Sequence, residues 1–146
     1  LLSVVTQNID GLHQAAGSER VWELHGSVKR NRCAKCGARY DEAFVLASEG
    51  IPKCEKCGGT VRPCVVLYGE SLDRDVLEGA ICDISRADVL IIAGTSLAVY
   101  PAAMLPDYFN GRELVLVNKT PTARDGIATL TVYGDVAEVC RSLSSV

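Results

Sequence analysis

Residues 33–59 read CAKCGARYDEAFVLASEGIPKCEKCGG, with one Cys-x-x-Cys pair at each end. The first pair is Cys33 and Cys36, the second is Cys54 and Cys57, and seventeen residues separate the pairs. This spacing is typical of a zinc site built from four thiolates, and the glycines that follow each pair permit the tight turns of two knuckles. Two disulfides or four unrelated core thiols are the alternative. Four protein ligands leave no open position for water, so the expected zinc is structural.

The composition is that of an ordinary globular protein, with 146 residues and 48% apolar residues. A formal net charge of -3 argues against a general nucleic-acid-binding surface. The longest apolar run, near residues 89–93, is too short to span a membrane. We expect the remaining cysteines to be reduced and mostly buried thiols in a reducing compartment. These are Cys64, Cys82 and Cys140. With no signal peptide recognised, a cytoplasmic location is expected.

Short apolar runs alternate with amphipathic segments on both sides of the cysteine-rich stretch, which predicts a doubly wound parallel α/β sheet. The expected strands cover residues 1–6, 21–25, 88–93, 113–117 and 130–133, and the expected helices residues 12–16, 73–85, 101–109 and 135–143. The continuous apolar runs after residue 85 predict strands that are covered on both faces.

Residues 27–62 differ in character, because they contain few large apolar side chains and would depend on metal to fold. Residues 40–48 within them are expected to form a strand and a short helix. We therefore predict two domains, residues 1–26 with 63–146 and an inserted zinc module at 27–62.

Polar residues follow three of the expected strands, at the sheet edge where open parallel sheets bind ligands. They are Gln7, Asn8, Ile9 and Asp10, then Gly94, Thr95 and Ser96, then Asn118. Gly94–Ser96 suits a phosphate group but equally suits a plain turn. Asn8 and Asp10 can bind an amide-bearing ligand or cap their own backbone. His25 is a candidate general base, with a structural role as the alternative.

In this order, the run TQNIDGLH at 6–13, LHG at 24–26, the cysteine pairs and GTS at 94–96 resemble the sirtuins, the NAD-dependent protein lysine deacylases. The resemblance implies a Rossmann-like NAD-binding domain around the zinc module. It implies release of nicotinamide from NAD and transfer of the acyl group of an acyl-lysine protein or peptide to ADP-ribose. His25 matches the catalytic base, and Asn8 also belongs to the catalytic set. The implied NAD-binding residues are Gln7, Asn8, Ile9, Asp10, Gly94, Thr95, Ser96 and Asn118. The implied substrate-binding residues are Val65, Val66, Leu67, Tyr68 and Gly69, which would pair with a peptide backbone.

The chain departs from the family pattern at Leu67 and Tyr68, where Trp-Phe is usual, and at Cys64, where a polar residue is common. The family's first strand, Gly-Ala-Gly loop and Asp-Phe-Arg segment match nothing in this sequence. We therefore expect a piece of a larger protein, with weak or no activity alone. Two rival functions stay open, an ADP-ribosyltransferase on the same scaffold and a zinc-stapled peptide-binding module without catalysis. A nucleic-acid zinc ribbon has weaker support, from the basic cluster of Lys29, Arg30, Arg32 and Lys35.

Overall fold

The computed structural model describes residues 1–143 and divides the chain into two compact units, Leu1–Glu78 and Gly79–Val146. The predicted division at residues 26/27 and 62/63 stays a prediction. Among the helices of the described chain, none has both the length and the hydrophobicity required of a membrane-spanning segment.

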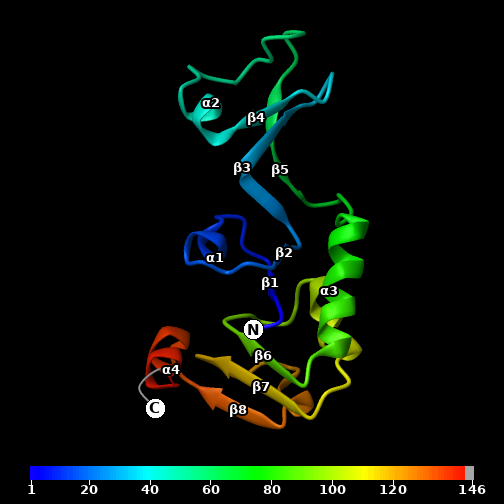
Figure 1. Cartoon of the computed structure of the whole chain (residues 1–146), viewed down its shortest axis with the longest axis vertical. Coiled ribbons are helices and arrows are strands. Elements are labelled where there is room, and N and C mark those ends of the chain that lie inside the picture. Colours follow the sequence, from blue (N-terminus) through cyan, green and yellow to red (C-terminus); the bar gives the residue numbers. More distant parts are fainter. Residues whose placement is uncertain (144–146) are drawn as a thin grey trace. The chain divides into compact units, whose positions relative to one another are not determined.

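The first unit begins with two short parallel strands, β1 (Val4–Thr6) and β2 (Val21–Glu23). The connection between them carries α1 (Leu12–Ala15), as expected for residues 12–16 (Figure 1). Asp10 holds the start of this helix, since its Oδ1 accepts a hydrogen bond from the Leu12 N–H at 3.0 Å. The β1–β2 pairing therefore places the loop of residues 7–10 at the carboxyl end of a parallel strand.

The rest of the first unit is an antiparallel sheet in the order β4-β3-β5. Its strands are β3 (Gly26–Cys33), β4 (Arg39–Asp41) and β5 (Val61–Val65). Helix α2 (Glu42–Leu46) follows β4 directly, so the strand and short helix predicted within residues 40–48 are confirmed (Figure 1).

A small core holds this sheet to α2, and the cysteines form part of it. Cys33, Cys54 and Val61 are buried there, and Tyr40 and Phe44 pack against them. Because so few apolar side chains take part, hydrophobic burial contributes little in this region, in line with the expected dependence on metal.

The second unit contains three parallel strands in the order β6-β7-β8. They are β6 (Val89–Ala93), β7 (Glu113–Asn118) and β8 (Leu130–Tyr133), and they lie side by side in Figure 1 with α4 (Val136–Leu143) beside their carboxyl ends. Its buried core consists of Ile92, Leu97, Leu114 and Leu116. The strands expected at 88–93, 113–117 and 130–133 are thus confirmed.

Helix α3 (Arg74–Arg86) crosses from the first unit into the second and agrees with the expected helix at 73–85. Asp73 caps it, because its Oδ1 accepts hydrogen bonds from the N–H groups of Asp75 and Val76. Asp135 caps α4 in the same way. Both helices begin one residue after the aspartate, since the capping residue itself is not helical.

Three expectations about burial and helix type are wrong. Strand β6 is not covered on both faces, because Val89 and Ile91 remain 51% and 60% exposed while Ile92 is buried. The physical reason is alternation at the edge of the sheet, which directs only every second side chain into the core of the unit.

The expected helix at 101–109 is a 3-10 helix over Ala102–Tyr108 rather than an α-helix. Pro106 lies inside it and has no N–H to donate. A short 3-10 segment tolerates this loss, whereas an α-helix would be interrupted there.

The third incorrect expectation is that the cysteines outside the two pairs are mostly buried. Cys82 and Cys140 are exposed and Cys64 is half-buried. Cys82 follows the fully buried Ala80 by two positions, which is about 200° around an α-helix, so its side chain faces away from the core.

Candidate functional site

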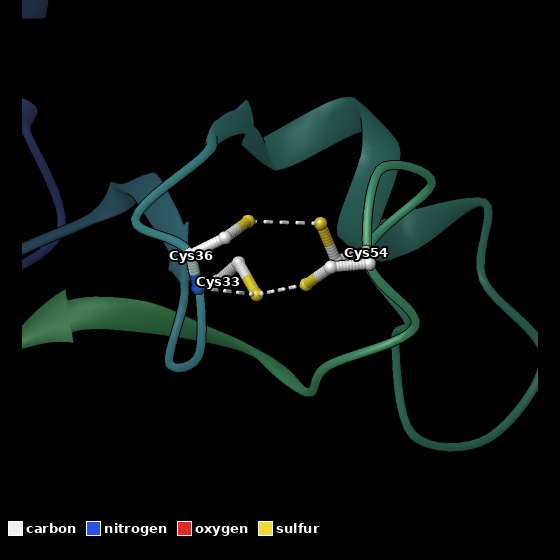
Figure 2. A group of neighbouring side chains, drawn as sticks. Cys33, Cys36 and Cys54 are labelled. Atoms are coloured by element: carbon white, nitrogen blue, oxygen red, sulfur yellow. Dashed lines mark hydrogen bonds between the residues drawn. The ribbon is translucent and has the colours of Figure 1, made fainter.

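The four predicted zinc ligands come together in the first unit, with their sulfur atoms all within 4.8 Å of one another. Figure 2 shows the sulfur atoms of Cys33, Cys36 and Cys54 turned toward a common centre. Cys33 Sγ lies 3.5 Å from Cys57 Sγ, and Cys36 Sγ lies 3.6 Å from Cys54 Sγ. Zn–S bonds of about 2.3 Å in a tetrahedron place sulfur atoms about 3.8 Å apart, so the spacing fits zinc, and it is far too long for disulfide bonds of about 2 Å.

Each knuckle is closed by local backbone contacts. Gly37 and Gly58 adopt left-handed conformations, with φ of 72° and 69°. Their N–H groups donate to the carbonyl groups of Cys33 and Cys54, at 3.0 and 2.8 Å. These turns require glycine and follow from the sequence, as predicted.

The electrostatics of the cluster favour a cation at its centre. The Tyr40 hydroxyl lowers the pKa of Cys54 to about 6, and the backbone N–H of Cys36 lowers the pKa of Cys33. Although the Gly59 N–H lowers the pKa of Cys57, the sulfur atoms of Cys36 and Cys33 raise it to about 12. The thiolate forms of Cys54 and Cys33 are thus favoured, whereas a negative charge on Cys57 is opposed unless a metal ion neutralises it. The donor set therefore fits a structural Zn²⁺ with four thiolate ligands.

Tyr40 is a member of this site that sequence reasoning missed. Its hydroxyl group donates to Cys54 Sγ at 3.2 Å and accepts from the Glu55 N–H at 2.9 Å. Its ring packs on Phe44 with the ring centroids 4.2 Å apart. The contact joins residues fourteen positions apart, so no local motif indicates it.

His25 lies half-buried between β2 and β3, and its ring is oriented by the loop after β1. Its Nδ1 lies 3.0 Å from the carbonyl oxygen of Gln7. Because a carbonyl oxygen accepts hydrogen bonds and cannot donate them, Nδ1 carries the proton in this contact. In the neutral ring Nε2 then keeps its lone pair, which is the form that a general base requires.

Gly26 fixes how closely this histidine approaches β5. It has a φ of 75°, and a Cβ atom built there would lie 2.0 Å from the carbonyl oxygen of Cys64. The His25 carbonyl group accepts from the Val66 N–H at 3.0 Å. The structure thus brings the candidate base and the predicted substrate segment together through the backbone.

Hydrogen bonds of both side-chain and backbone groups anchor the loop of residues 7–10. The Asn8 N–H donates to Thr6 Oγ1 at 3.1 Å, and the Ile9 carbonyl group accepts from the Val28 N–H at 3.0 Å. The Asp10 carboxylate accepts the Leu12 N–H, a bond to the neighbouring backbone that agrees with the alternative role considered for it, whereas the Asn8 side chain is exposed. Loop, His25 and β3 therefore form one connected group of residues.

The remaining predicted ligand residues lie in the second unit, around a cavity of about 560 Å³. Its lining includes Gly94, Thr95, Ser96, Asn118 and the start of α4. The buried Asn118 side chain fixes the loop of residues 94–96, because Oδ1 accepts from the Thr95 N–H at 3.0 Å and Nδ2 donates to the Thr95 carbonyl group at 2.6 Å. Gly94 is left-handed, with φ of 63°.

The structure thus brings the predicted site residues together as two groups, one in each unit. Gln7–Asp10 and His25 belong to the first unit, and Gly94–Ser96 and Asn118 belong to the second. One crevice containing both groups stays a prediction.

The predicted substrate segment continues from β5 and turns at Tyr68 and Gly69. Leu67 and Tyr68 are exposed, at 54% and 107% of their reference areas. Glu70 ties the turn back, since its carboxylate accepts from the Leu67 N–H at 3.0 Å and pairs with Arg62 at 2.7 Å. The Arg62 guanidinium is the main cause that lowers the pKa of Glu70 to about 2.

Comparison with known proteins agrees with this geometry. A model of the Sir2 family matches residues 1–101. An NAD-dependent protein deacetylase of Clostridium perfringens is 59% identical over 140 residues, covering 95% of this chain and 57% of the relative. An NAD-dependent protein deacetylase of Staphylococcus aureus is 44% identical over 142 residues, covering 97% and 58%.

Among solved structures, a complex of Sir2 with a p53 peptide and NAD+ matches with a TM-score of 0.91 and 44% identity. It aligns with 98% of this chain, which covers 62% of that chain. The chain therefore spans about three fifths of the length of the relatives it matches. The parallel strands, the cysteine cluster and this likeness confirm the predicted Rossmann-like α/β fold with a zinc-ribbon module.

Proposed function

The chain belongs to the Sir2 family, and from this premise we propose that the protein is an NAD-dependent protein lysine deacetylase. The observation that carries the proposal is the orientation of His25, whose Nδ1 is held 3.0 Å from the Gln7 carbonyl oxygen. This contact leaves Nε2 as the acceptor of a proton in the neutral ring. The proposed function is also supported by relatives named as NAD-dependent protein deacetylases and by a solved Sir2 structure bound to acetylated peptide.

In this proposal the bond between nicotinamide and the ribose of NAD breaks, and nicotinamide is released. The acyl group moves from the lysine side chain to the ADP-ribose that remains. The reaction is therefore a transfer. The role of His25 is to take a proton from a ribose hydroxyl group. Asn8 is the second member of the proposed catalytic set. Gln7, Ile9 and Asp10 would bind the nicotinamide side.

The cavity of the second unit is proposed to hold the adenosine side of NAD. Gly94, Thr95 and Ser96 offer backbone N–H groups and two hydroxyl groups, which suit phosphate and ribose oxygens. Asn118 contributes by fixing this loop through both atoms of its amide. Its contribution to binding would then arise through Thr95.

An acyl-lysine peptide is the proposed partner, and residues Val65–Gly69 would pair with its backbone. The supporting geometry is that β5 is an edge strand of the β4-β3-β5 sheet. The zinc cluster stabilises the module that presents this edge, and with four protein ligands it offers no position for the reacting groups. We also propose a cytoplasmic location, since the thiols of the cluster must stay reduced to bind zinc.

The test follows nicotinamide release by the complete protein in the presence of NAD and an acetyl-lysine peptide. His25→Ala should abolish turnover, whereas His13→Ala, the matched change at the other histidine, should retain it. Mass spectrometry of the peptide separates the proposed loss of acetyl groups from a gain of ADP-ribose. Gain of ADP-ribose without deacetylation would replace the proposal with a protein ADP-ribosyltransferase. Peptide binding without NAD binding or turnover would replace it with a non-catalytic binding module.

A further inference from the structure

One face of the β4-β3-β5 sheet carries a row of arginines. Arg32 on β3 is paired in register with Arg39 on β4 and with Arg62 on β5. Residues directly opposite each other in antiparallel strands point to the same face, about 5 Å apart. Because side chains alternate along a strand, this face is opposite the one on which Cys33 and Val61 pack into the zinc core.

Like charges directly opposite each other destabilise a sheet unless something neutralises them. Arg62 is neutralised within the chain, because two of its nitrogen atoms contact the Glu70 carboxylate, at 2.7 and 3.0 Å. Arg32 and Arg39 are exposed and form no ion pair with any residue of the described chain, 1–143. Arg32 acts on Glu70 only at longer range, as a minor cause of its lowered pKa. The other cations that line the same groove, Lys29 and Arg30, are ion-paired at 2.6 and 2.7 Å.

Arg32 and Arg39 of this row line a groove of about 920 Å³ that lies entirely within the first unit. Four carboxylates line it, and each one is already engaged. Glu23 and Glu70 each form an ion pair with an arginine at 2.7 Å. Asp41 and Asp73 cap α2 and α3 by accepting backbone N–H groups at 2.9 and 3.0 Å. The two unpaired guanidinium groups are therefore available to an anion from outside the chain.

We propose that this groove binds an acidic segment of polypeptide, with Arg32 and Arg39 as the groups that clamp its carboxylates. Guanidinium groups match carboxylates in a two-point geometry, and such charge-assisted pairs are the stronger hydrogen bonds. A peptide is favoured over a nucleic acid because two guanidinium groups can neutralise one or two carboxylates, whereas the chain, with its net charge of -3, repels a continuous phosphate backbone.

The same groove is lined by Val65 and Val66, so it is continuous with the proposed substrate segment. This part of the inference rests on the proposed function. Arg62, the β5 member of the arginine row, lies three residues from Val65, which corresponds to about 10 Å along a strand. The acidic residues would therefore stand about three to five positions from the acyl-lysine of the substrate.

The test measures binding of fluorescent peptides to the chain of residues 1–146 by anisotropy. One peptide has Glu at the third to fifth positions on either side of a central lysine, and its counterpart has Gln there. Both are made with and without acetylation of that lysine. We expect the acidic peptide to bind roughly five- to tenfold more tightly than its counterpart in low salt, and the preference to shrink in 0.5 M NaCl because exposed ion pairs are screened.

Arg32→Gln/Arg39→Gln should remove this preference, whereas Lys53→Gln/Lys56→Gln, which removes the same charge outside the groove, should retain it. Zinc content and circular dichroism verify that each variant is folded. Arg32→Lys/Arg39→Lys keeps the charge but loses the two-point geometry of the guanidinium groups, so it should give an intermediate preference. Equal affinity for acidic and neutral peptides, or a preference that survives the Gln variant, would overturn the proposal. So would tighter binding of a single-stranded oligonucleotide that displaces the acidic peptide. The effect of acetylation tests the proposed function separately from the effect of charge.

Discussion

Replacing Tyr40 with phenylalanine removes one oxygen atom from the outer shell of the cysteine cluster and leaves the ring in place. The hydroxyl group donates to Cys54 Sγ at 3.2 Å, and the ring keeps its contact with Phe44. Since a metal binds the thiolate and not the thiol, any change that raises the pKa of Cys54 lowers the apparent affinity for zinc.

The magnitude follows from the protonation of Cys54. With a pKa of about 6, this sulfur is mostly thiolate at pH 7. A thiol of ordinary pKa, about 8.5, is only ~3% thiolate at that pH, so complete loss of the shift would cost roughly thirtyfold in affinity. Outer-shell substitutions at metal sites typically cost about 10–100-fold, which is consistent with this value. We expect Tyr40→Phe to weaken zinc binding by roughly tenfold at pH 7 and by less at pH 9, where the thiol ionises without help.

A chromophoric zinc chelator in competition with the protein measures the effect, at several pH values. Tyr108→Phe, which removes a hydroxyl group far along the sequence from the cysteine pairs, serves as the matched control and should leave zinc affinity unchanged. The reasoning fails if Tyr40→Phe holds zinc as tightly as the wild-type protein at pH 7, or if its loss of affinity does not depend on pH.

Three other changes probe separate features. Leu116→Ala, at a residue 1% exposed in the core of the second unit, should lower the free energy of unfolding by about 2–5 kcal/mol in urea titrations. Asp125 accepts hydrogen bonds chiefly from Thr122 and also from Tyr133, which lower its pKa; its charge therefore stabilises the folded state fully above pH 3.8 and progressively less below it. Asp125→Asn should therefore reduce amide-exchange protection in β7, and this reduction should become smaller as the pH falls from 7 to 3. Gly59→Ala would place a Cβ atom 2.9 Å from a cysteine sulfur, so the same chelator assay should show weakened zinc binding, and unchanged affinity would contradict the crowding seen there.

Features that depend on neighbouring residues could be predicted from the sequence. The Cys-x-x-Cys spacing and the following glycines identify the knuckles, and Asp73 and Asp135 mark the starts of two helices. Local backbone sterics and hydrogen bonds within a few residues decide these features, so a short window of sequence contains the necessary information.

Solvent exposure could not be predicted in the same way. Val89 and Ile91 belong to a run that looks continuously buried, yet both are exposed. An apolar residue indicates a strand, whereas its burial depends on which elements cover that strand, and those come from distant parts of the chain. The exposure of Cys82 and Cys140 depends on distant elements in the same way.

The sequence by itself determined the family, the alternation of strands and helices and the identity of the zinc ligands, because each of these resides in the order and spacing of residues. The tertiary structure alone decided that His25 is held by the Gln7 carbonyl group, that Tyr40 reaches Cys54 and that Arg32 stands between Arg39 and Arg62. These contacts join residues seven to thirty positions apart, and they follow from strand register and chain packing. Register is a property of how two strands meet, so neither strand contains it alone.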